Sequence, residues 1–172
     1  MASAPKVEAL FDIVQAAKQA KIAAPAIANL DAKTRKNLLM SIAERLIQNT
    51  EALLAANHID IQNAKVSGLS SAMLERLALT ESSVQKIAQS VIEVANQQDV
   101  LGSISELNTQ QSGIQVGKMR IPLGVIAMIY ESRPNVTIDA AVLCLKAGNA
   151  VILRGGKEAI ASNQALAEVL HQ

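Results

Sequence analysis

The sequence predicts an α/β fold in which N-terminal helices precede a β-hairpin and a β-α-β-α unit, one half of a doubly wound sheet. Three observations support this prediction. Apolar residues recur at helical spacing before Asp99, glycines punctuate short runs after it, and two apolar runs flank a hydrophobic helix beyond Pro122. We therefore expect a helical region at 1–98, a hairpin segment at 99–121 and an α/β unit at 122–172.

The helical region is recognised from apolar stripes and from residues that start and stop helices. The first stripe consists of Val7, Leu10, Phe11 and Val14. Pro25 is expected to interrupt the Ala-rich stretch that follows this stripe. Asp31 and Thr80 are expected to cap two later helices, and Gly68 to end a helix between them. A short helix is expected at about 72–77.

The hairpin is predicted from an alternating run of apolar residues. This run contains Ile114, Val116, Met119 and Ile121. Such alternation indicates a strand, here with one irregularity after Val116. Residues 105–109 are the expected partner strand, across a turn at Gln110-Gln111.

The α/β unit is predicted from two short β-branched runs. Val125–Tyr130 and Ala150–Leu153 are typical of parallel strands buried on both faces. An apolar helix at 136–147 lies between them, and a last helix is expected at 159–171. Two strands do not make an independently stable sheet. Because the chain stops at Gln172, where a third strand would begin, we expect the N-terminal part of a longer enzyme.

Composition excludes several classes of protein. Sixteen basic and 15 acidic residues give a net charge of +1, and one Tyr, one Phe and no Trp offer almost no surface for stacking bases. Nucleic-acid binding is therefore not expected. There is neither a signal peptide nor a membrane-spanning apolar run, so we expect a cytoplasmic protein with no membrane partner. His58 and His171 lack partners at metal-ligand spacing, so no metal site is expected.

Two polar segments follow the two strands, where ligands bind in open α/β sheets. The first, residues 131–135, is an elbow that holds an acid, a cation and an amide within five residues: Glu131, Ser132, Arg133, Pro134 and Asn135. The second, residues 154–158, is a turn with adjacent glycines whose amides could approach a phosphate or ribose: Arg154, Gly155, Gly156, Lys157 and Glu158. The alternative is that both are ordinary loops with solvated charges, since the turn matches neither G-x-G-x-x-G nor the Walker pattern.

Cys144 is the only thiol in the sequence and therefore a candidate nucleophile. It lies among apolar neighbours in the second half of the predicted helix at 136–147. A reactive thiolate favours a helix N-terminus or an exposed cationic setting. A buried structural cysteine is the favoured interpretation, and a single cysteine in a reducing compartment makes no disulfide.

Residues 122–163 resemble the γ-glutamyl phosphate reductase (glutamate-5-semialdehyde dehydrogenase) family, within the aldehyde dehydrogenase superfamily. The elbow YESRPNVT and the segment LCLKAGNAVILRGG carry the resemblance, with weaker support from residues 56–80 and 113–124. The resemblance implies NADPH-dependent reduction of L-glutamyl 5-phosphate to L-glutamate 5-semialdehyde and phosphate, in proline biosynthesis. It also implies a homo-oligomer, with residues 105–121 in an oligomerisation arm, and a nucleophilic cysteine in a domain that this sequence does not contain.

The resemblance also implies residue roles. Asn135 is the candidate to hold a developing oxyanion, and Arg133 and Ser132 to bind the substrate's anionic group. Arg154 takes the place of a lysine that contacts the adenosine ribose in the superfamily, and a cation there favours the 2′-phosphate of NADP. Gly155, Gly156, Lys157 and Glu158 complete the expected cofactor-binding turn.

Two alternatives remain open. The chain could come from another aldehyde dehydrogenase, although its ESRPN elbow differs from the superfamily's usual aromatic-asparagine pair. It could also be a non-catalytic module that docks on full-length subunits through its helices, in which case it would bind such subunits without turning over substrate.

Overall fold

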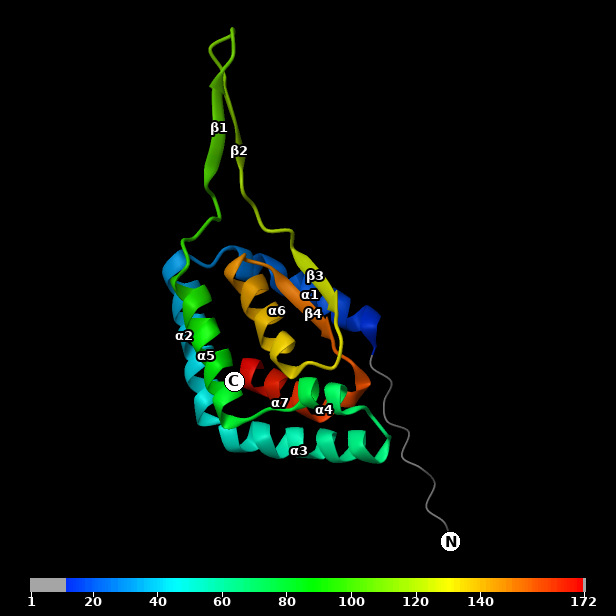
Figure 1. Ribbon diagram of the computed structural model, residues 1–172. Coiled ribbons are helices and arrows are strands. Elements are labelled where there is room, and N and C mark those ends of the chain that lie inside the picture. Colours follow the sequence, from blue (N-terminus) through cyan, green and yellow to red (C-terminus); the bar gives the residue numbers. More distant parts are fainter. Residues whose placement is uncertain (1–11, 172) are drawn as a thin grey trace.

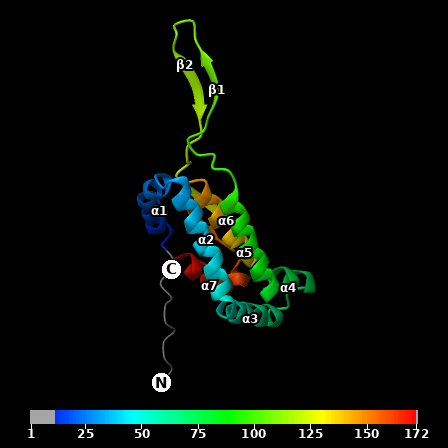
Figure 2. The same cartoon turned by 90° about the vertical axis from the view of Figure 1, so that its left-hand side faces the viewer.

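The computed structural model describes residues 12–171 and begins with a set of five helices (Figure 1). These are α1 (Ile13–Ala28), α2 (Ala32–Gln48), α3 (Thr50–Val66), α4 (Ser71–Leu77) and α5 (Glu81–Asn96). Figure 2 shows α2 and α5 side by side along the body of the molecule. Most of the stripe predicted at 7–14 lies outside the described residues.

The predicted helix-starting and helix-stopping residues are confirmed. The Asp31 carboxylate accepts a hydrogen bond from the Thr34 N–H at 2.6 Å, at the start of α2. Thr80 and Ser83 form a reciprocal capping box at the start of α5. Gly68, two residues beyond α3, adopts a φ of +75°, which favours glycine.

Pro25 does not interrupt α1, contrary to the prediction. The helix continues through it to Ala28, and the Pro25 carbonyl still accepts the Asn29 N–H at 3.1 Å. Proline cannot donate the hydrogen bond that an N–H at this position would make to the Lys21 carbonyl. Because Lys21 is exposed, water can replace that donor at little cost.

The main core lies where α2 and α5 pack against the C-terminal helices α6 (Pro134–Lys146) and α7 (Ile160–His171). The apolar stripes of these helices supply its buried side chains, which include Leu39, Ile42, Leu46, Val84, Val91, Ile138, Val142, Leu166 and Val169. Each fully buried aliphatic side chain contributes about 1.5–3 kcal/mol. This core fixes α6 and α7, and therefore also the two loops that precede these helices.

The predicted hairpin is present and extends away from the body (Figures 1 and 2). Strands β1 (Ile104–Thr109) and β2 (Gln115–Met119) pair antiparallel, and all their residues are exposed. The pairing is irregular at Gly117, directly after Val116 as predicted, and the extra residue lies in β1. Two β1 residues, 106 and 107, face the single Gly117. The turn is longer than Gln110-Gln111: the Gln110 N–H donates to the Ile114 carbonyl.

The C-terminal unit has the predicted β-α-β-α order. Strands β3 (Val125–Ile129) and β4 (Ala150–Arg154) pair in parallel, flank α6, and are followed by the 3-10 turn η1 (Lys157–Ala159) and α7. The prediction that both strands are buried on both faces is wrong. Most residues of the pair are only half-buried, and Ile129 is 75% exposed. Among the described residues, α1 and α6 are the main helices that contact this two-stranded sheet, and β3 pairs with β4 alone.

The predicted fold class, helices followed by small sheets in a mixed α/β arrangement, is confirmed. Among residues 12–171, no helix is long and apolar enough to cross a membrane.

Candidate functional site

The elbow at 131–135 and the turn at 154–158 form one site. Since β3 and β4 are parallel neighbours, their carboxyl ends meet at the same edge of the sheet. The pairing extends one residue beyond β3, where the Tyr130 N–H donates to the Arg154 carbonyl at 3.0 Å. The Ser132 hydroxyl then donates to the Glu158 carboxylate at 2.5 Å, which joins the elbow directly to the turn.

The two glycines of the turn make room for the protein's own side chains. A Cβ at Gly156 would lie 2.0 Å from the Ser132 Oγ, and one at Gly155 would lie 2.2 Å from the Asn163 Nδ2. Either substitution would push the elbow or α7 away from the turn. Two adjacent glycines predict a turn that a ligand can approach, whereas their nearest neighbours in the structure are Ser132 and Asn163.

A chain of hydrogen bonds that the sequence does not predict supports the site. The Tyr130 hydroxyl lies 2.7 Å from the Thr137 hydroxyl, which in turn donates to the Asn163 amide oxygen at 2.8 Å. This chain links the end of β3 to α6 and α7, and so fixes the elbow relative to the turn. The only sequence signal was a lone tyrosine at the end of an apolar strand.

The turn presents two cations and one anion. Arg154 and Lys157 are exposed, and neither forms an ion pair with any carboxylate in residues 12–171. The hydrogen bond from Ser132 is the main cause that lowers the pKa of Glu158, so this carboxylate is ionised at neutral pH. The turn can therefore bind an anionic group with its cations and accept hydroxyl donors with Glu158.

The elbow divides its polar groups between two directions. Arg133 lies 2.6 Å from the Glu131 carboxylate, measured from Nε, and Arg76 of α4 approaches the same carboxylate at 3.6 Å. Asn135 belongs to the first turn of α6 and donates to the Asp139 carboxylate at 3.2 Å. It lines a pocket between α4, α5 and α6, whose lining includes no residue of the turn.

Cys144 is buried in α6, as predicted, with 5% of its surface exposed. Burial raises the pKa of this thiol, so the nucleophilic thiolate is disfavoured. His58 is exposed and bonds to Gln62 of the same helix, and His171 is exposed at the end of α7. The described residues contain no group of three or more His, Cys, Asp or Glu side chains that could hold a metal ion.

Comparison with curated proteins finds close relatives. The γ-glutamyl phosphate reductase of Colwellia psychrerythraea is 49% identical over 162 residues, covering 94% of this chain and 39% of the relative. That of Desulfatibacillum aliphaticivorans is 50% identical over 158 residues, covering 92% of this chain and 38% of the relative. The chain thus spans well under half the length of these relatives.

Solved structures agree. The γ-glutamyl phosphate reductase of Thermotoga maritima superposes with a TM-score of 0.88 at 31% identity, covering 91% of this chain and 38% of that one. The Saccharomyces cerevisiae protein of the same name superposes with a TM-score of 0.86 at 32% identity, and the match covers 91% of this chain and 40% of that one. PnpE, solved in complex with nicotinamide adenine dinucleotide, shares the fold at a TM-score of 0.64 and 22% identity, covering 93% and 31%.

These relatives confirm the resemblance to the γ-glutamyl phosphate reductases that the elbow and the 143–156 segment indicated. The model of the aldehyde dehydrogenase family matches residues 2–172. The chain therefore belongs to the aldehyde dehydrogenase family.

Proposed function

We propose that this chain contributes the cofactor-binding turn and part of the substrate site to an enzyme that reduces L-glutamyl 5-phosphate to L-glutamate 5-semialdehyde and phosphate. NADPH is the proposed reductant, and proline biosynthesis the proposed pathway. The observation that carries the proposal is the contact between elbow and turn, which brings Arg133, Arg154 and Lys157 to one edge of a parallel sheet. The names of the relatives at 49% and 50% identity supply the substrate.

The residues of the turn fit a phosphorylated dinucleotide. Arg154 and Lys157 are exposed cations, and a guanidinium binds a 2′-phosphate through two parallel hydrogen bonds. Glu158 is held ionised and oriented by Ser132, so that it can accept a hydrogen bond from a ribose hydroxyl. Gly155 and Gly156 contribute by keeping the turn closely packed on the elbow. NADPH, when bound, supplies the hydride.

The elbow fits the reacting end of an acyl phosphate. Arg133 carries a fixed positive charge for a phosphate or carboxylate, and Ser132 positions the turn beside it. The Asn135 side-chain amide has two N–H groups, of which one is given to Asp139. The other can donate to an oxyanion that develops on the substrate's carbonyl.

We assign the nucleophile to a cysteine outside these 172 residues, because the single thiol of the chain is buried. Replacing Cys144 by alanine in the protein that carries this chain should keep most of kcat and cost about 1 kcal/mol of stability. Replacing it by aspartate should impair folding far more, since that buries an unpaired charge. Steady-state kinetics and urea denaturation check both. A folded, NADPH-binding Cys144→Ala protein without turnover would contradict this assignment.

Arg154→Glu should weaken NADPH binding about 10- to 100-fold and NADH binding far less, because it removes a charge-assisted pair worth ~1.5–3 kcal/mol and adds repulsion. Titration of each cofactor by its fluorescence measures both effects. Lys36→Glu, at an exposed cation of α2 outside the turn and the hairpin, is the matched control and should change neither affinity. Equal losses for the two cofactors would mean that Arg154 only holds the loop in place.

The reaction itself is tested in the oxidative direction, with L-glutamate 5-semialdehyde, phosphate and NADP. We expect NADPH to accumulate with the protein that carries this chain, in a phosphate-dependent manner, and not with residues 1–172 alone. Turnover by residues 1–172 alone would contradict the assignment of the nucleophile. A phosphate-independent oxidation would instead favour another aldehyde dehydrogenase activity.

We further propose that the protein is a cytoplasmic homo-oligomer whose hairpin docks on another copy. The hairpin and its flanks expose apolar side chains that a monomer would leave in water, namely Ile104, Leu107, Ile114, Val116, Met119 and Ile121. Such a docked hairpin would bury this surface against another subunit.

A further inference from the structure

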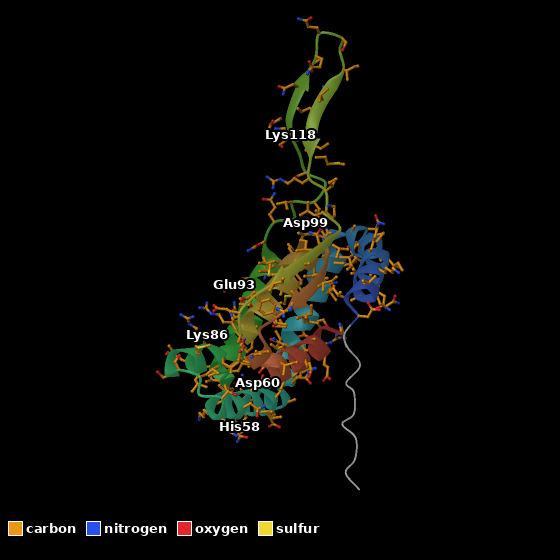
Figure 3. All side chains as sticks on the ribbon, turned by 90° about the vertical axis from the view of Figure 1, so that its right-hand side faces the viewer. His58, Asp60, Lys86, Glu93, Asp99 and Lys118 are labelled. Carbon is orange, nitrogen blue, oxygen red and sulfur yellow. The ribbon has the colours of Figure 1, made fainter. Side chains whose placement is uncertain are left out.

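A pocket lined by both polar and apolar residues adjoins the elbow at Pro134 and Asn135. It has a volume of about 290 Å³ and lies between α4, α5 and the first turns of α6. Its ionisable residues are Arg76, Lys86 and Asp139, and Asn135 of the elbow forms part of its wall. Figure 3 shows Lys86 towards the α4 end of α5. None of these groups except Asn135 has a role in the function proposed above.

The two hydroxyl groups in the pocket wall are already engaged by the protein. Ser83 Oγ accepts the Thr80 N–H and donates to the Thr80 carbonyl, as part of the α5 capping box. Ser90 Oγ donates to the Ile87 carbonyl at 2.8 Å. The donors and acceptors that remain for a ligand are therefore those of the charged residues and Asn135.

The charged residues of the pocket do not neutralise one another. Asp139 is half-buried and accepts one hydrogen bond, from Asn135, but no cation of residues 12–171 lies within 4.0 Å of it. Burial accordingly raises the pKa of this carboxyl. Lys86 forms no ion pair within the same residues, and Arg76 only the 3.6 Å contact with Glu131. The pocket thus holds an acid without a cation and a cation without an acid.

We propose that this pocket binds the zwitterionic α-amino-acid end of the substrate, with Asp139 receiving the ammonium group and Lys86 the carboxylate. A ligand with both charges supplies the missing partner at each position. A ligand with only one charge leaves the other position uncompensated, and this makes the pocket selective for an α-amino acid. Arg76, which contacts Glu131 at 3.6 Å, adds positive charge to the pocket wall.

The position of the pocket fits a substrate that reaches the elbow. Asn135 both lines the pocket and follows Arg133 by two residues, so one extended ligand can contact the pocket and the elbow together. The amino-acid end would then lie against α5 and α6, and the reacting carbonyl against the elbow. This inference rests on the proposed function for the identity of the reacting end, but the pocket's preference for a zwitterion can be measured separately.

Binding of L-glutamate and of glutarate, which lacks the ammonium group, provides the first test. We expect the protein that carries this chain to bind L-glutamate, and Asp139→Asn to weaken that binding tenfold or more without affecting glutarate. Lys86→Met should weaken the binding of both ligands, because both carry a carboxylate. Lys36→Met, at an exposed lysine of α2 outside the pocket, is the matched control and should weaken neither. Titration calorimetry measures all four proteins.

Turnover of three aldehydes provides the second test: L-glutamate 5-semialdehyde, 5-oxopentanoate without the ammonium, and 4-aminobutanal without the carboxylate. Asp139→Asn should reduce kcat/KM for the first and third, and Lys86→Met for the first and second. Equal losses for all three aldehydes in both variants, or no loss in either, would overturn the inference. Should the unmodified protein bind L-glutamate selectively but oxidise no aldehyde, the proposed reaction fails and the pocket assignment stands.

Discussion

Replacement of Asp60 by alanine is expected to lower the free energy of unfolding by about 3 kcal/mol or more, because it leaves buried donors without an acceptor. Asp60 belongs to α3, is 2% exposed, and faces the start of α7. Figure 3 shows it between these two helices. Its carboxylate accepts the Ala161 N–H at 3.1 Å, the Ser162 N–H at 2.7 Å and the Ser162 hydroxyl at 2.6 Å. The two N–H groups belong to the first turn of α7, where no carbonyl of the helix can accept them.

Two measurements check this result. Urea denaturation gives the loss of stability, and amide hydrogen exchange at Ala161 and Ser162 reports the loss of their acceptor directly. Asp60→Asn keeps one carbonyl oxygen, so its free energy of unfolding should lie between those of the native protein and Asp60→Ala. Asn63→Ala, at an exposed position of the same helix, should change the free energy of unfolding by no more than ~0.5 kcal/mol. If Asp60→Ala unfolds at the same urea concentration as the native protein, the Asp60 carboxylate does not stabilise the fold.

This network matters for the site as well as for stability. Asn57, one turn before Asp60, donates to the Leu77 carbonyl at 2.8 Å and to the Ser162 hydroxyl at 3.0 Å, and its oxygen accepts the Leu79 N–H at 2.7 Å. It therefore joins α3, the end of α4 and α7. Since α7 follows the turn at 154–158 directly, the network fixes the C-terminal end of that turn by holding the start of α7 against α3.

Local sequence patterns predicted most of the elements but not this network. The helices and strands follow from periodicity and from caps such as Asp31 and Thr80, whose partners lie within three residues. Asp60 and Ser162 are far apart in the chain, and neither departs from an ordinary helical pattern. Only the packing of α3 against α7 makes Asp60 a helix cap.

The site shows the same division. The meeting of elbow and turn could be predicted, because parallel strands bring their carboxyl ends to one edge. The side-chain contacts between the elbow, the turn and α7 could not be predicted from the sequence. Gly156 is close to Ser132, and Gly155 to Asn163, through side-chain positions that only the tertiary structure defines. The exposure of Ile129 likewise depends on what covers the sheet rather than on the apolar run itself.

Replacement of Arg35 by methionine is expected to cost about 3 kcal/mol of stability at neutral pH, because it breaks a largely buried ion pair. Arg35 in the first turn of α2 is 5% exposed and lies 2.5 Å from the Asp99 carboxylate, and it also donates to the Leu30 carbonyl. Asp99, whose side chain is 19% exposed, also accepts the Leu101 N–H at 3.0 Å, just before the hairpin. The pair therefore joins α2 to the base of the hairpin.

The cost of the Arg35 substitution should depend on pH. Burial alone would raise the pKa of Asp99, but the hydrogen bond and charge of Arg35 outweigh it, so that the pKa lies below its ordinary value of 3.8. A carboxyl with a lowered folded pKa contributes stability above its unfolded pKa, and the contribution is lost as the pH falls through the folded value. The difference between native protein and Arg35→Met should accordingly be full at neutral pH and shrink as the pH falls below the ordinary value of 3.8 towards the lowered folded value.

Some cost should remain in acid, because Arg35 still donates to the Leu30 carbonyl when Asp99 is protonated. Asp99→Asn separates the two contributions: it should remove the pH-dependent part and leave the contact with Leu30 intact. Lys36→Met, at the next residue and exposed, should change stability by no more than ~0.5 kcal/mol at either pH. Urea denaturation of the four proteins at neutral and acid pH decides the matter. A cost for Arg35→Met that is the same at both pH values would mean that Arg35 stabilises the fold through packing and the Leu30 carbonyl, and that its charge on Asp99 adds nothing.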